Sequence, residues 1–161
     1  MNNKKTAYLG LFAAVAIIFG YMESLFPFFA GIPGIKLGLA NLAVLFILET
    51  YTWKEAAVVS AVRIVVIGFL FGNMFTIIYS LAGAALSLFV MTLMKKSSGF
   101  SILGISVAGG VSHNIGQLMV AALIVENTSL LYYAPVLLIS GMITGLLIGI
   151  LTKEVTKRIH L

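Results

Sequence analysis

The chain has 161 residues, of which 61% are hydrophobic and only 9% are charged, and its mean hydropathy is +1.13. Soluble domains carry about 25% charged residues, so this composition excludes a soluble globular protein and indicates an integral membrane protein. Cysteine is absent, which excludes a disulfide framework and thiolate chemistry. The net charge of +5 comes from basic residues placed between apolar segments, so it indicates membrane orientation and no nucleic-acid partner.

The apolar segments predict an all-α polytopic membrane protein with six transmembrane helices in the lipid bilayer. The first segment continues past Gly20 without a cleavage site, which favours a retained helix over a signal peptide. Turns separate the segments, among them a loop over 26–34 with two prolines, a tight turn at Gly72-Asn73 and a polar turn over 126–129. The predicted spans lie at about 6–25, 35–48, 55–71, 74–94, 100–125 and 131–151, in one transmembrane domain over residues 1–161.

The lysines and arginines orient this bundle. In the six-span arrangement, Lys36 is the basic residue near the opposite side, and eight others fall together: Lys4, Lys5, Lys54, Lys95, Lys96, Lys153, Lys157 and Arg158. Because positively charged loops stay in the cytoplasm, we expect a cell-membrane protein with both termini cytoplasmic.

Small residues recur at helical spacing in the first and last spans. Such patterns let helices approach closely, either within one chain or against a partner membrane subunit. In the first span they are Gly10, Ala14, Ala16 and Gly20. In the last span they are Gly141, Gly145 and Gly149, which would form a smooth groove along one helix face.

A polar stretch, Gly109-Gly-Val-Ser-His-Asn-Ile-Gly-Gln117, lies inside the fifth predicted span. On a helix, His113 and Gln117 are one turn apart and share a face. Such groups are costly in a bilayer unless they face the protein interior or a wet cavity. His113 is therefore either a core histidine hydrogen-bonded across helices or, with Asn114 and Gln117, part of a wall that orients a polar ligand.

Arg63 lies near the centre of the third predicted span. A central arginine normally pairs with another group or lines a cavity, and its planar fork suits carboxylate or phosphate groups. Two interpretations stay open for it, namely ligand contact or a structural pair with Glu23 or a helix carbonyl. Lys36 and Asn41 of the second span complete the candidate set, and Lys36 either snorkels to the headgroups or meets negative charge. Under the predicted topology these groups lie in the outer half, so we expect a cavity that opens outward.

The sequence offers little for catalysis. It contains no aspartate, no phosphate-cradling glycine loop with its lysine, and no carboxylate ligand beside His113. We therefore expect no enzyme activity, no metal and no cofactor. Any transport would have to draw its energy from an ion gradient or from separate ATPase subunits.

The strings Pro33-Gly-Ile-Lys-Leu-Gly-Leu-Ala-Asn41 and Ser112-His-Asn-Ile-Gly-Gln117, with Arg63 between them, resemble the family called heptaprenyl diphosphate synthase component I, also known as the Gx transporter family. The resemblance covers essentially the whole chain. That family in turn resembles the substrate-binding S components of energy-coupling factor transporters. This implies a six-helix bundle that docks through small residues of its first helix onto a transmembrane coupling subunit driven by ATPases. The docking residues would be Gly10, Ala14, Ala16 and Gly20.

Three hypotheses follow. The leading one is a substrate-binding membrane subunit for a small polar or anionic metabolite, such as a vitamin-like or isoprenoid or quinone precursor. Its cavity would be lined by Lys36, Asn41, Arg63, His113, Asn114 and Gln117. The alternative is a non-catalytic membrane accessory subunit of a heptaprenyl diphosphate synthase or a redox enzyme, since prenyl diphosphate synthases use aspartate-rich motifs that this chain cannot supply. The third is a structural protein that self-associates through the glycine face of the last span.

Overall fold

The computed structural model describes residues 3–25 and 38–159. These residues form helices and no strand, which confirms the predicted all-α class. The predicted loop 26–34 and Lys36 lie outside the described residues. The helices are α1 (Asn3–Leu25), α2 (Leu39–Thr50), α3 (Trp53–Phe71), α4 (Met74–Lys96), α5 (Ile102–Val125), the 3-10 helix η1 (Thr128–Tyr133) and α6 (Ala134–Arg158).

Four helical segments are long and apolar enough to cross a membrane, namely α1, α4, α5 and the continuous stretch of η1 and α6. α3 has 19 residues but carries Lys54, Glu55 and Arg63. α2 has 12 residues. That corresponds to roughly 18 Å, well short of the roughly 30 Å hydrocarbon core. The chain is a multi-pass helical membrane protein, and the prediction of six spans stays a prediction for α2 and α3.

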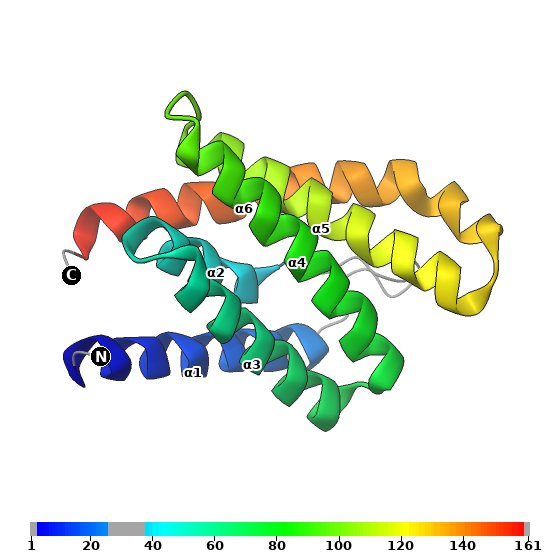
Figure 1. Ribbon diagram of the computed structural model, residues 1–161, viewed down its shortest axis with the longest axis horizontal. Coiled ribbons are helices and arrows are strands. Elements are labelled where there is room, and N and C mark those ends of the chain that lie inside the picture. Colours follow the sequence, from blue (N-terminus) through cyan, green and yellow to red (C-terminus); the bar gives the residue numbers. More distant parts are fainter. Residues whose placement is uncertain (1–2, 26–37, 160–161) are drawn as a thin grey trace.

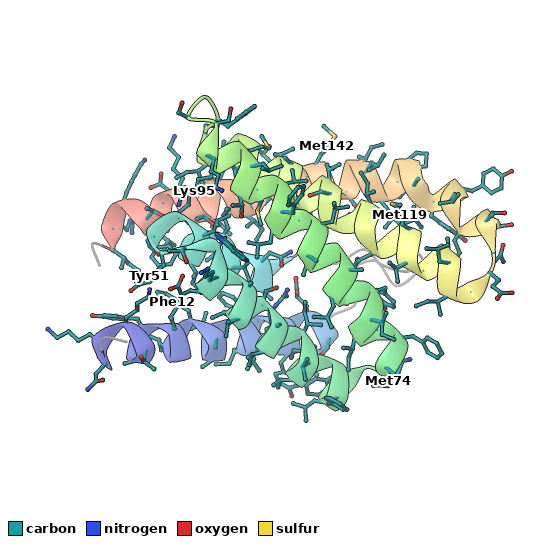
Figure 2. The ribbon with its side chains drawn as sticks, viewed as in Figure 1. Phe12, Tyr51, Met74, Lys95, Met119 and Met142 are labelled. Carbon is teal, nitrogen blue, oxygen red and sulfur yellow. The ribbon has the colours of Figure 1, made fainter. Side chains whose placement is uncertain are left out.

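The outer surface of the bundle is apolar, as contact with lipid requires. Met74, Met119 and Met142 are more than half exposed, and Figure 2 shows Met142 pointing away from the bundle. Because hydrocarbon solvates these side chains as well as a protein core does, their exposure carries no penalty in a bilayer.

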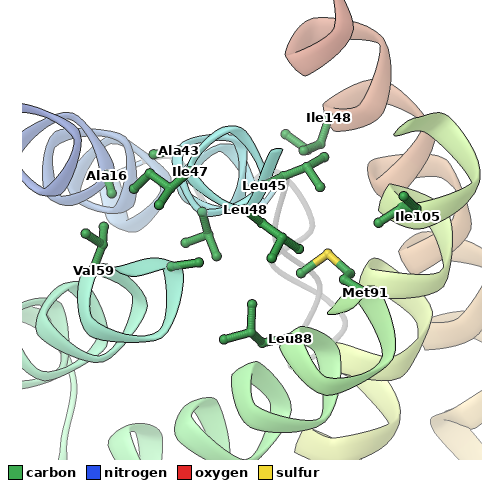
Figure 3. Packing of buried hydrophobic residues seen from close by; sticks show 12 residues of the cluster. Ala16, Ala43, Leu45, Ile47, Leu48, Val59, Leu88, Met91, Ile105 and Ile148 are labelled. Carbon is green, nitrogen blue, oxygen red and sulfur yellow. The ribbon is translucent and has the colours of Figure 1, made fainter. Parts of the chain in front are cut away.

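α2 forms the centre of the bundle and contacts α1, α3 and α6. Its Val44–Leu48 segment is almost fully buried. In Figure 3, Ile47 lies beside Ala16 of α1, and Leu48 points towards Met91 of α4. A helix that is apolar on all sides is typical of an enclosed position. The helix that the hydropathy pattern predicts as a span is therefore surrounded by the rest of the protein.

Glycines bring α4, α5 and α6 close together, and α5 lies beside α6 in Figure 1. A Cβ atom added to Gly145 of α6 would lie 2.8 Å from the carbonyl oxygen of Ser106 in α5. Gly141 and Gly149 also face the backbone of α5. The glycine face of α6 is thus covered inside the chain, and the hypothesis of self-association through this face is wrong.

Local caps set the starts of α3 and α4. Thr52 and Glu55 form a capping box at the start of α3, and Asn73 Oδ1 accepts a hydrogen bond of 2.9 Å from the amide of Thr76. The predicted turn at Gly72-Asn73 is therefore confirmed. The polar turn that begins at Glu126 is also present, with that residue in the left-handed region at φ 52°. The sequence did not predict the 3-10 helix η1 that follows it.

The cap at Asn73 leads to a stability prediction. Replacing Asn73 with alanine removes the acceptor of the Thr76 amide, so we expect the free energy of unfolding to fall by about 1 kcal/mol. Unfolding of the purified protein in detergent micelles measures this change. The Asn73→Ser variant keeps a capping oxygen and should remain within a few tenths of a kcal/mol of the wild type. Equal losses in the two variants would show that the cap is not the cause.

Both termini lie at one end of the molecule (Figure 1). Basic and acidic side chains form ion pairs at this end. Lys5 Nζ lies 2.5 Å from Glu55 Oε1, which ties α1 to α3. Lys95 Nζ lies 3.7 Å from Glu49 Oε2 and donates to the carbonyl oxygens of Leu48 and Glu49 at the last turn of α2. A lysine at a helix C-terminus also interacts favourably with the helix dipole. These contacts fix one end of the bundle and leave the polar cavity described below at the other.

Candidate ligand-binding site

A cavity of about 140 Å³ lies between the helices, with side chains from all six α-helices in its wall. A water molecule needs about 10–15 Å³ on this measure, so the space corresponds to roughly ten waters, the room that a small metabolite requires. Five of the six predicted ligand-binding residues line it: Asn41, Arg63, His113, Asn114 and Gln117. The sixth, Lys36, lies outside the described residues.

Arg63 and Asn41 form one wall. Arg63 Nη2 donates a hydrogen bond of 3.1 Å to Asn41 Oδ1. The Nε atom of Arg63 is buried and has no hydrogen-bond partner in the described part of the chain. Leaving such a donor unsatisfied is costly. The guanidinium group thus keeps binding capacity beside the cavity, which a ligand oxygen can fill.

Asn114 and Gln117 of α5 form part of the facing wall. Asn114 Nδ2 donates to the carbonyl oxygen of Leu137 at 2.7 Å, and Gln117 Nε2 donates to Ser80 Oγ at 3.4 Å. Because these bonds use the amide nitrogens, the amide oxygens remain as acceptors. This wall therefore suits a ligand that carries hydroxyl or N–H groups, whereas the Arg63 wall suits negative charge.

Glycines bring α4 against the polar stretch of α5. A Cβ atom added to Gly83 would lie 2.6 Å from Gln117 Cγ and 2.7 Å from the carbonyl oxygen of His113. A Cβ on Gly116 would lie 3.0 Å from the carbonyl oxygen of Ala82. The close approach sets the positions of His113 and Gln117 at the cavity, so these glycines position the site.

Glu23 of α1 also lines the cavity. Its Oε1 accepts a hydrogen bond of 2.8 Å from the backbone amide of Leu39, the first residue of α2. From the sequence, Glu23 was predicted only as one structural partner of Arg63. The contact with a backbone amide could not be derived from spacing, because it joins two helices through tertiary packing.

Four hydroxyl residues of the wall were missed by sequence reasoning, namely Ser24, Thr76, Ser80 and Thr144. Thr144 Oγ1 donates to the carbonyl oxygen of Ser140 at 2.9 Å. Such local bonding is common for hydroxyls in apolar helices, so Thr144 carries no signal by itself. For Ser80 a signal existed, because Thr76, Ser80 and Gly83 share one face of α4 at helical spacing.

A second, smaller cavity of about 40 Å³ adjoins the first. The two share five wall residues: Gly38, Asn41, Gly110, His113 and Thr144. Hydroxyl groups of the second cavity come from Ser60, Ser87 and Ser106. The polar interior therefore extends beyond Arg63 and the α5 amides. Within the described residues, no group of three or more His, Cys, Asp or Glu side chains is placed to hold a metal ion.

The predicted docking residues of α1 separate into two pairs. Ala16 is fully buried in the core, and Gly20 is buried with a Cβ position 3.1 Å from Ile67. Gly10 and Ala14 are exposed, and nothing lies within 4 Å of a Cβ on Gly10. Ala16 and Gly20 thus pack within the chain, and Gly10 and Ala14 are the small residues that a partner helix can reach.

The fold and the cavity define a helical multi-pass membrane protein with a polar internal site. Over residues 12–155 the chain matches the family described as heptaprenyl diphosphate synthase component I, and it belongs to that family. The predicted family is thereby confirmed. No curated protein and no solved structure shows a match with the chain.

Proposed function

We propose that this protein is a substrate-binding membrane subunit that captures a small polar or anionic metabolite. The observation that supports this most is the convergence of Asn41, Arg63, His113, Asn114 and Gln117 on one cavity. Polar side chains inside a membrane bundle are expensive and are normally retained for a function. A cation on one wall and amide oxygens on the other fit a ligand with an anionic group and hydrogen-bond donors, such as a vitamin-like or isoprenoid or quinone precursor.

The proposed location is the cell membrane, with both termini in the cytoplasm. The end that holds both termini is rich in lysine, as the positive-inside rule requires. Glu23, Asn41 and Gln117 belong to the half of the bundle away from that end. With this orientation the cavity would open outward, and the protein would take its ligand from outside the cell.

Movement of the ligand would need a partner, namely a transmembrane coupling subunit with ATPases, as in S components. Gly10 and Ala14 lie one turn apart on the exposed face of α1, and small residues permit a close helix–helix contact. Replacing both with leucine should leave the fold and the ligand affinity unchanged but reduce co-purification of a membrane partner by at least about tenfold. The control is Ala61→Leu on the exposed face of α3. Unchanged recovery of the partner would exclude this docking face.

Native mass spectrometry of the protein purified from its own host tests the proposed function. The expected result is a bound metabolite together with a coupling subunit and ATPases. A protein that carries no metabolite and is bound to a soluble prenyltransferase would overturn the proposal.

The second candidate is a non-catalytic membrane accessory subunit of a heptaprenyl diphosphate synthase or a redox enzyme. The family description supports it, since it names a component of that synthase. Catalysis would then belong to other subunits, because the chain contains no aspartate to bind magnesium–diphosphate. This candidate predicts that the polar cavity binds no free metabolite and that a prenyltransferase co-purifies.

A further inference from the structure

The Arg63 end of the cavity already contains a carboxylate. Glu23 lines the cavity together with Arg63 and Asn41, and it exerts an electrostatic attraction on the guanidinium group of Arg63. Its second contact is the hydrogen bond of 2.8 Å from the amide of Leu39. The carboxylate of Glu23 thus accepts a hydrogen bond from the N-terminus of α2 and also lies near the charge of Arg63.

The contact with Leu39 makes Glu23 an N-terminal cap for α2. The N-cap residue of this helix is Gly38, at φ 74°, which offers no side-chain acceptor. The first amides of a helix have no acceptor inside the helix, and the helix dipole favours negative charge there. α1 therefore supplies from outside the carboxylate that the first turn of α2 lacks.

The N-terminus of α2 and Arg63 together form a corner of hydrogen-bond donors beside the cavity, which we call the donor corner. Asn41 of the first turn of α2 accepts from Arg63 Nη2, so the guanidinium group lies beside that turn. Arg63 Nε is buried without a hydrogen-bond partner among the described residues. Glu23 and Asn41 therefore accept hydrogen bonds from only some of the donors at this corner. The negative charge of Glu23 also offsets the positive charge of Arg63.

We infer that Glu23 is a built-in counter-ion, and that the anionic group of the ligand, a carboxylate or a phosphate, binds Arg63 and the α2 N-terminus in competition with it. This inference rests on the proposed function. Two negative charges at one partly buried corner repel each other. The ligand must therefore bind against the charge of Glu23, which lowers affinity and favours release.

The Glu23→Gln variant tests this inference, because glutamine keeps an oxygen that accepts from Leu39 but removes the charge. The probes are radiolabelled glycolate and inorganic phosphate, measured by equilibrium binding to the full-length protein in lipid nanodiscs. We expect the dissociation constant of at least one probe to fall about tenfold. Binding of glycolate alone would identify a carboxylate subsite, and binding of phosphate alone a phosphate subsite.

Two further variants make the result decisive. Glu126→Gln removes a carboxylate from the exposed turn after α5 and should leave affinity unchanged. Glu23→Ala also removes the charge and replaces the glutamine variant if the latter does not fold. Binding that depends on Arg63 but is not tightened in the Glu23 variants would overturn the counter-ion inference alone. Absence of Arg63-dependent binding of both probes, in wild type and in the Glu23 variants, would overturn capture of an anion as well.

Discussion

Replacing Gly110 with alanine is expected to destabilise the protein more than any other single methyl addition considered. A Cβ atom at this position would lie 2.4 Å from the carbonyl oxygen of Gly141. Neither atom belongs to a flexible side chain, so α5 and α6 would have to separate. Overpacking of this kind costs about 1–3 kcal/mol, and we expect a loss near the upper end. Thermal unfolding in detergent and the yield of folded protein measure it.

Separation of these helices would also disturb the site. Gly110 lines both cavities, and one turn further along α5 the amide of Asn114 donates to the carbonyl oxygen of Leu137. The hydrogen bond between α5 and α6 should therefore weaken in the Gly110→Ala variant. Loss of ligand binding would accompany the loss of stability.

Gly10→Ala is the matched control for this change. Nothing lies within 4 Å of a Cβ atom at Gly10, and alanine is a better helix former than glycine by about 1 kcal/mol. The control should be neutral or slightly stabilising. If Gly110→Ala were equally harmless, α5 and α6 would not be in the close contact that the structure gives them.

Most helices could be predicted from the sequence because their signals are local. The predicted span 74–94 corresponds to α4, Met74–Lys96, and its start follows from the cap at Asn73. The lysines at the end of α4 extend the helix beyond the apolar segment. The last predicted span, 131–151, differs more, because α6 begins after η1 and continues through basic residues to Arg158.

α2 shows what hydropathy cannot distinguish. The apolar segment was predicted to span the membrane over residues 35–48, whereas the helix covers Leu39–Thr50 and is enclosed by other helices. A leucine contributes the same apolar character whether lipid or protein surrounds it. Burial of Val44–Leu48 depends on neighbours that are distant in sequence, so it could not be read from the segment itself.

The members of the site were easier to predict than their contacts. Polar residues in apolar helices are conspicuous, and the cost of placing them in lipid predicts that they face inward. The bond from Arg63 to Asn41 and the bond from Leu39 to Glu23 depend on how α1, α2 and α3 pack. The structural partners predicted for Arg63 were Glu23 and a helix carbonyl, and the side-chain amide of Asn41 was not among them.

Replacing Arg63 with alanine is expected to weaken anion binding strongly while the fold persists. The variant removes the charge that faces the cavity and the donors of Nη2 and Nε. Hydrogen bonds to a charged group contribute about 1.5–3 kcal/mol, and loss of the upper value weakens binding on the order of 100-fold. Arg158→Ala in the exposed last turn of α6 is the control for loss of one positive charge.

The stability of the Arg63→Ala variant separates a ligand-binding arginine from a structural one. Burying a guanidinium nitrogen without a partner is unfavourable, so removing it relieves a cost that partly balances the lost bond to Asn41. We therefore expect the unfolding temperature in detergent to stay within a few degrees of the wild type. If the variant unfolds, Arg63 would instead be a structural residue that holds α1, α2 and α3 together. A binding protein retains such a polar site although it lowers stability, because the site contributes affinity. The ligand then supplies the hydrogen-bond partners that the empty cavity lacks.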